Sequence, residues 1–206
     1  MKGLPSFFSV LILLLLSLTS SVSASPGNNS TFIEKKVLKL GLLLPMTGDL
    51  STQGQGQLAA IKMARDEMNL FFDQLQAPYQ LSLDLQDTEA NPDRALQSLK
   101  VLHQNGINIV IGPASSESAR ACLEYARQND IIMISPSSTS TDLIGQKPDN
   151  LIRLSPNDDL QGQALASLIA KQGIENVIIV NRGDIWGDRL QQALKQHFNS
   201  LKGKVN

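Results

Sequence analysis

Two short segments rich in hydroxyl side chains are the residues best suited to chemistry in this sequence. The first contains Ser115 and Ser116, and the second contains Ser137, Ser138 and Thr139. Each segment follows an apolar run and a proline. Hydroxyl groups and the free N–H groups of a helix N-terminus both donate hydrogen bonds to anions, so together they would suit a carboxylate. The alternative is ordinary helix capping, for which serine and threonine are preferred residues.

Trp186 is the only tryptophan in the sequence. It follows a predicted strand and lies near Gly183 and Gly187, in a stretch that reads as a polar loop. A tryptophan in such a loop could cover a ligand by stacking or by apolar contact. Ordinary packing is the alternative, so the residue is a candidate ligand contact.

The groups that catalysis needs are scarce. His103 and His197 are the only histidines, and both belong to predicted helices away from the hydroxyl-rich segments. Cys122 is the only cysteine; its surroundings, SARACLEYA, resemble the apolar face of a helix, which predicts a buried, inert thiol. The paired Asp158 and Asp159 precede a predicted helix, and we expect them to cap it. We therefore expect no catalytic residue, no metal site, no cofactor and no enzyme activity.

Gly54, Gly56 and Ala59 match the spacing of a dinucleotide-binding fingerprint. That fingerprint requires its first glycine in the tight turn directly after a strand, but the preceding predicted strand ends near Leu44. The acidic residue that should follow about 20 positions later is also missing. The spacing therefore does not indicate a nucleotide site.

Apolar runs of strand length alternate with segments of helical periodicity along the chain. Continuous apolar runs indicate strands buried on both faces, which is typical of a parallel sheet. The fold class is therefore α/β, a parallel sheet with helices on both faces. The expected strands are 37–44, 80–87, 107–111, 131–134, 151–154 and 177–180, and the expected helices are 58–70, 92–104, 116–128, 159–172 and one ending near 198.

The N-terminus is typical of an exported protein. The apolar run FFSVLILLLLSL (7–18) follows Lys2, is too short to span a bilayer and precedes the small residues around Ala24. We expect a signal peptide over 1–24 and a polar tether over 25–36; an uncleaved segment would instead keep the protein membrane-associated. The formal net charge of −1 without a basic stripe argues against nucleic acid as a partner.

Five stretches together resemble the type I periplasmic binding proteins, in particular the leucine/isoleucine/valine-binding branch that serves ABC importers. They are LKLGLLLPMTGDLSTQGQGQLAAIKMARDEMN, LQDTEANPDRALQSLKVL, INIVIGPASSESA, IIMISPSSTSTDL, and LIRLSPNDDLQGQALA followed by NVIIVNRGDIWGDRL. They cover almost all of the chain after the signal peptide, in the family's order.

The resemblance implies two α/β lobes joined by crossovers and closing on a ligand. The first lobe would span 37–155, with a crossover and a partial second lobe over 156–206, because members of the family continue well beyond this length. The ligand carboxylate would meet the two hydroxyl-rich segments, and an aromatic residue, often tyrosine, would stand where Trp186 does. Tryptophan here removes a hydroxyl and enlarges the covering residue, which leaves the identity of the ligand open.

The resemblance implies a periplasmic or extracellular substrate-binding protein. It would capture an amino acid or related small carboxylate and deliver it to an ABC transporter permease. Two alternatives remain: the ligand-binding domain of a receptor or sensor, and a truncated fragment that binds weakly.

Overall fold

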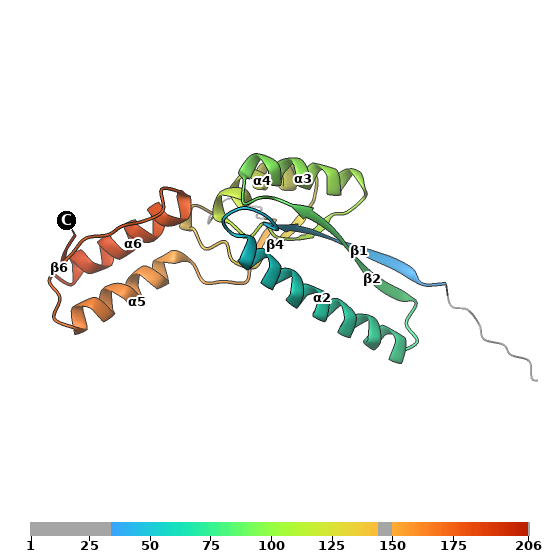
Figure 1. The fold of residues 1–206 in the computed structure, drawn as a ribbon, viewed down its shortest axis with the longest axis horizontal. Helices are drawn as coiled ribbons and strands as arrows, with labels where there is room; N and C mark the ends of the chain where they lie inside the picture. The colour runs from blue at the N-terminus through green and yellow to red at the C-terminus, as the bar shows by residue number, and fades with distance from the viewer. Residues whose placement is uncertain (1–33, 144–149, 206) are drawn as a thin grey trace, which may run out of the picture. The chain divides into compact units, whose positions relative to one another are not determined.

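The computed structural model describes residues 34–143 and 150–205 (Figure 1). Lys35–Asn206 form one compact unit, separate from Met1–Glu34. The expected signal peptide and nearly all of the expected tether lie outside the described residues. Within the described ranges, no helix combines the length and the apolar content that crossing a bilayer requires.

A five-stranded, wholly parallel sheet forms the centre of the fold. Its strands are β1 (Lys36–Leu44), β2 (Tyr79–Asp87), β3 (Ile109–Ile111), β4 (Ile132–Ser135) and β5 (Leu151–Arg153). Their order in the sheet is β2-β1-β3-β4-β5, so the winding reverses between β1 and β3. In open α/β sheets, ligands bind outside the carboxyl ends of the strands at such a reversal. The topology therefore points to the loops that follow β1, β3 and β4.

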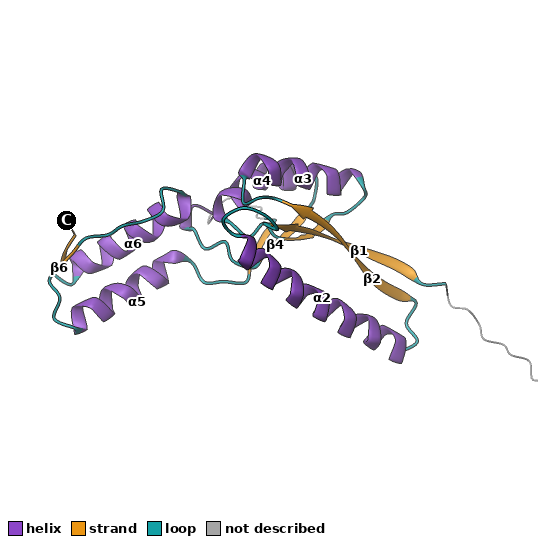
Figure 2. Ribbon diagram, in the orientation of Figure 1, coloured by secondary structure: helices purple, strands orange, loops and turns teal. Residues whose placement is uncertain are grey.

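Helices cover both faces of this sheet, as Figure 2 shows. Helices α3 (Pro92–Gln104) and α4 (Ser116–Gln128) lie on one face, and α2 (Ser51–Gln74) lies on the other. The start of α3 follows from its sequence: the Asn91 side chain accepts a hydrogen bond from the Arg94 N–H at 3.0 Å, and Pro92 occupies the first helical position. The predicted parallel sheet with helices on both faces is confirmed.

The main core lies between the sheet and helices α3 and α4. Leu43, Val110 and Met133 contribute from the strands, and Leu102 and Cys122 contribute from the helices; all five side chains are fully buried. Burial raises the pKa of the Cys122 thiol to about 12, because the thiolate would lose its hydration. The prediction that this thiol is buried is confirmed, and its inertness stays a prediction.

The C-terminal part of the chain has its own small core. Helices α5 (Asp158–Lys171) and α6 (Ile185–Ser200) pack against each other, and the short strands β6 (Asn176–Val177) and β7 (Lys204–Val205) pair in parallel. Ala166, Leu194 and Phe198 form the centre of this second cluster. The helices approach closely because Gly162 has no side chain: a Cβ there would lie 2.6 Å from the Ala193 Cβ.

Two of the predicted elements differ most in extent from the observed ones. The helix expected over 58–70 spans Ser51–Gln74, and its first turns contain mainly Ser, Thr, Gln and Gly, which give no apolar period. The strand expected over 177–180 is assigned only at Asn176–Val177, because β7 pairs with these two residues alone. Ile178 and Val180 beyond that ladder are 78% and 93% exposed.

Gly54 and Gly56 both lie inside α2 rather than in a turn after a strand. Gly54 is buried because the helix crosses the end of β1 there, and a Cβ on it would lie 2.1 Å from the Pro45 carbonyl oxygen. Close helix packing therefore explains this glycine, which does not occupy the tight turn after a strand that the fingerprint requires.

Candidate functional site

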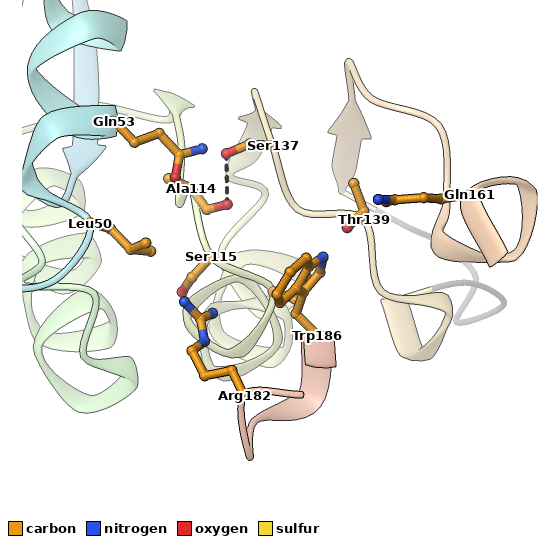
Figure 3. Close-up of a pocket in the computed structure, with 10 residues that line it drawn as sticks. Leu50, Gln53, Ala114, Ser115, Ser137, Thr139, Gln161, Arg182 and Trp186 are labelled. Carbon is orange, nitrogen blue, oxygen red and sulfur yellow. Dashed lines mark hydrogen bonds between the residues drawn. The ribbon is translucent and has the colours of Figure 1, made fainter. Parts of the chain in front are cut away.

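A cavity of about 250 Å³ opens at the carboxyl ends of β1, β3 and β4, next to the N-terminus of α6 (Figure 3). It occupies the edge of the sheet that the strand order indicates. Its lining residues are Leu50, Gln53, Ala114, Ser115, Ser116, Ser137, Thr139, Gln161, Arg182 and Trp186. Five of the six residues predicted to contact a ligand are in this set.

The segment between β3 and α4 supplies two hydroxyls that accept backbone hydrogen bonds and line the cavity. The Ser115 Oγ caps α4 by accepting a hydrogen bond from the Ser118 N–H at 3.2 Å, so the capping interpretation is confirmed for this residue. The Ser116 Oγ accepts one from the Ser140 N–H at 3.2 Å. A hydroxyl that accepts in this way still has its own proton to donate. Both side chains can therefore hold the loop in place and donate to an anion in the cavity.

Ser137 and Ser138 of the β4 loop are placed differently from each other. The Ser137 hydroxyl donates to the Ala114 carbonyl oxygen at 2.9 Å, the dashed line in Figure 3, and accepts from the Gln57 side-chain amide at 3.1 Å. Its proton is thus already engaged. Ser138 is fully buried and does not line the cavity; its N–H donates to the Ser135 Oγ at 3.1 Å. These two residues fix the loop. Thr139 also lines the cavity, but its hydroxyl oxygen is buried.

Trp186 is not in a loop, so that part of the prediction is wrong. It is the second residue of α6, whose N-cap is Asp184; the Asp184 carboxylate accepts from the Gly187 N–H at 2.8 Å. The turn is tight, because a Cβ on Gly187 would lie 2.0 Å from the Arg182 carbonyl oxygen. An Asp cap followed by Ile, Trp and Gly shows no helical period, which is why the sequence suggested a loop. The helix gives the indole a fixed support beside the cavity.

Arg182 is the one charged side chain among the lining residues that the structure describes. Its guanidinium stacks on the Trp186 ring at 5.3 Å from the ring centroid and forms an ion pair with Asp184. Figure 3 shows the Arg182 guanidinium directed toward the Ser115 hydroxyl. A cation beside hydroxyl donors and the N-terminus of α4 makes this cavity suited to an anionic ligand.

Half of the residues that line the cavity were not predicted from the sequence. Leu50 and Gln53 come from the start of α2, which carried no helical signal, and Gln161 and Arg182 come from the C-terminal elements. The position of Arg182 four residues before Trp186 was an available signal, since both follow the same apolar run.

The loop after β1 is held by Asp87 instead of lining the cavity. The Asp87 carboxylate accepts from the Met46 N–H at 2.8 Å and from the Thr47 hydroxyl at 2.7 Å. Burial raises the pKa of Asp87, but hydrogen bonds from Thr47, Glu89 and Met46 outweigh burial and leave the pKa below its ordinary value. This carboxylate therefore orients the chain that leads into α2.

Helix α5 is capped by Asn157, whose side chain accepts from the Leu160 N–H at 3.4 Å. The expectation that Asp158 and Asp159 cap this helix is therefore wrong. Asp159 instead lies 3.0 Å from the His197 Nε2. Across residues 34–143 and 150–205, no group of three or more His, Cys, Asp or Glu side chains is arranged to hold a metal ion.

Known proteins are similar to this chain in sequence. An uncharacterized protein of Methanocaldococcus jannaschii is 33% identical over 165 residues, which are 78% of this chain and 40% of that protein. The Leu/Ile/Val-binding protein BraC3 of Rhizobium johnstonii is 27% identical over 164 residues, 79% of this chain and 44% of that protein. The chain thus spans less than half the length of these relatives.

Structural comparison gives the same result. The crystal structure of the leucine binding protein LivK from Thermotoga maritima matches with a TM-score of 0.73 and 24% identity, covering 82% of this chain and 47% of that one. The resemblance to the leucine/isoleucine/valine-binding proteins is thereby confirmed at the level of sequence and fold. The family model described as "Receptor family ligand binding region" matches residues 56–206, and the chain belongs to that family.

Proposed function

We propose that this chain is the ligand-binding part of an exported substrate-binding protein that captures an amino acid or related small carboxylate for an ABC importer. One observation carries the proposal: the cavity at the strand ends combines hydroxyl donors, a helix N-terminus, one arginine and one tryptophan. These groups match a ligand with a carboxylate at one end and an apolar body at the other. Relatives that bind leucine, isoleucine and valine support the same ligand class.

The binding mechanism follows from the positions of these groups. The ligand carboxylate would accept hydrogen bonds from Ser115 and Ser116 at the N-terminus of α4, where the helix dipole favours negative charge. Arg182 would add a long-range attraction, and Trp186 would cover the apolar part of the ligand. None of the lining residues is a histidine, cysteine or carboxylate that could act as a general base, so the proposed role is binding without catalysis.

The rest of the assignment follows the family. Residues 37–155 would form the first lobe and 156–206 a crossover with part of a second lobe; two separate hydrophobic clusters support this division. Export would follow cleavage near Ala24, and a membrane permease would receive the ligand. The family's description as a receptor ligand-binding region favours a second candidate, a sensor domain with the same cavity.

The test is a ligand screen on the chain from Ser25 to Asn206. Thermal shift and Trp186 emission would be followed with the amino acids and with small carboxylates. Each ligand that binds would be compared with its analogue in which the carboxylate is reduced to an alcohol, such as L-leucine against leucinol. We expect the alcohol to bind at least tenfold more weakly, because a hydrogen bond to a charged group contributes about 1.5–3 kcal/mol.

Arg182 supplies the matched variants. Arg182→Gln should weaken carboxylate binding because the long-range attraction is lost, whereas Arg182→Lys, which keeps the charge, should retain most of it. Equal binding of acid and alcohol would contradict the carboxylate assignment. A screen with no response from any amino acid or carboxylate would contradict ligand capture by this chain.

A further inference from the structure

Asp158, the first residue of α5, is buried in an unusual way. Its exposed fraction is 0%, and neither carboxylate oxygen has a hydrogen-bond partner of normal geometry within the described residues. Its backbone N–H donates to the Thr139 carbonyl oxygen at 3.0 Å, which places the carboxylate beside the β4 loop. A buried carboxylate without partners is costly, so its presence here requires an explanation.

Two donors from the cavity wall surround this carboxylate. The Thr139 hydroxyl oxygen is also buried and has no partner of normal geometry in the described part of the chain. Figure 3 shows the indole nitrogen of Trp186 on the ring edge nearest to Thr139. Burial raises the pKa of Asp158, while the Thr139 hydroxyl, the charge of Arg153 and the Trp186 indole each oppose that rise. Thr139 and Trp186 both line the ligand cavity, whereas Asp158 does not.

Arg153 and the charged groups named below on α4, α5, α6 and the loops between them have partners of their own. Arg153 on β5 donates to the Ser140 carbonyl oxygen at 3.0 Å, and Glu117 on α4 accepts from the Ile185 N–H at 3.4 Å. The remaining pairs are Asp142 in the 3-10 helix Thr141–Leu143 with Arg189 of α6 at 2.8 Å, Asp159 with His197 at 3.0 Å, Asp184 with Arg182, and Asp188 with Asn181 at 3.0 Å. The Thr139 hydroxyl and the Trp186 indole are the two groups whose hydrogen bonds favour the ionised form of Asp158.

We propose that Asp158 is a positioning residue for the cavity, whose carboxylate ties the Trp186 indole of α6 to the Thr139 hydroxyl of the β4 loop. This proposal rests on the proposed function only for the identity of what the cavity holds. An ionised carboxylate is purely an acceptor, so its two oxygens match the hydroxyl and the indole N–H. In that state the Thr139 hydroxyl donates its hydrogen bond to the Asp158 carboxylate.

Protonation of Asp158 changes this arrangement. A protonated carboxyl has an O–H that can donate to the Thr139 oxygen, and the Thr139 proton is then free. The indole N–H keeps the second carboxyl oxygen as its acceptor. The ionisation of Asp158 therefore decides how firmly Trp186 is held and whether Thr139 can donate.

The experiment uses Trp186 as its reporter and needs no ligand. Because Trp186 is the only tryptophan, its emission reports the charge state of the group beside the indole. The emission of the chain from Ser25 to Asn206 would be titrated from pH 3.5 to 8, with far-UV circular dichroism to confirm folding at each pH. We expect a transition with a midpoint above the ordinary aspartate value of 3.8.

Matched variants assign that transition. Asp158→Asn should abolish it, and Asp159→Asn, which changes the neighbouring exposed carboxylate, should leave it intact. Thr139→Val should move the midpoint to higher pH because the ionised form loses a donor, and Thr139→Ser should leave it unchanged. The Thr139 pair tests the proposal even if Asp158→Asn does not fold.

Two results would overturn the proposal. The first is a transition that persists in Asp158→Asn, which would assign it to another group. The second is an identical midpoint in wild type and Thr139→Val, which would show that the hydroxyl and the carboxylate are not coupled. Both are independent of ligand binding, so failure of the proposed function would leave this test unaffected.

Discussion

Two glycines of α2 provide a sharp test of how this helix packs beside the cavity. Gly54 and Gly56 lie two residues apart in the same helix and would be equivalent in any measure of helix propensity. A Cβ on Gly56 meets nothing within 4 Å, whereas a Cβ on Gly54 would lie 2.1 Å from the Pro45 carbonyl oxygen and 2.7 Å from the Pro45 carbonyl carbon. The two substitutions to alanine should therefore have opposite signs.

The magnitude follows from these distances. Replacing a helical glycine by alanine contributes about 1 kcal/mol through backbone entropy. At Gly54 the backbone would have to separate by roughly 1.3 Å to reach ordinary contact, the difference between 3.4 and 2.1 Å. Overpacking of this kind costs about 1–3 kcal/mol or more, and backbone atoms cannot move aside as a flexible side chain can. We expect Gly56→Ala to be stabilising by about 0.5–1 kcal/mol and Gly54→Ala to be destabilising by about 2 kcal/mol.

Urea denaturation measures both effects. Unfolding would be followed by circular dichroism at 222 nm and by Trp186 emission, and the midpoints would be compared with wild type. In a thermal scan the expected changes correspond to an increase in Tm of about 2 °C for Gly56→Ala and a decrease of about 4–8 °C for Gly54→Ala. Equal stabilisation by both variants would refute the close contact between α2 and Pro45. It would also remove the structural basis for placing Leu50 and Gln53 at the cavity.

Three further predictions concern single side chains. Cys122 should resist alkylation by iodoacetamide at pH 8 in the native protein and react only on unfolding, because burial raises its pKa to about 12; rapid native labelling would contradict its burial. Asp87→Asn should lower the unfolding free energy at pH 7 by about 1–3 kcal/mol through weakened charge-assisted hydrogen bonds. The pKa of Asp87 is lower in the folded than in the unfolded protein. Its stabilising contribution is therefore present above the unfolded pKa and is lost as the pH falls through the folded pKa. The difference in Tm between Asp87→Asn and wild type should accordingly shrink in acid. The pH dependence is opposite for Asp158, whose pKa is raised in the folded protein. Its protonated form stabilises the folded state below the unfolded pKa of 3.8, and this stabilisation is lost as the pH rises through the folded pKa. Asp158→Asn should therefore raise Tm at pH 7 but not at pH 3.5.

The amino-acid sequence determined the class of fold and the edge of the sheet that carries the site. Continuous apolar runs such as Leu42–Leu44, alternating with segments of helical period, are typical of a parallel sheet covered by helices, so the pattern was sufficient to predict it. Because parallel strands end at the same edge, hydroxyl-rich segments after two strands had to lie near each other. Five of the six predicted contact residues accordingly line one cavity.

Tertiary structure decided everything that depends on contacts between distant parts of the chain. Gly54 and Gly56 differ only because α2 crosses Pro45 at one of them. Ser138 is turned into the protein while its neighbours Ser137 and Thr139 line the cavity, because its own N–H is held by Ser135. The burial of Asp158 beside Thr139 likewise brings together two segments that no local pattern connects. Local sequence sets which elements form, whereas the packing of elements against one another sets which side chains face the cavity.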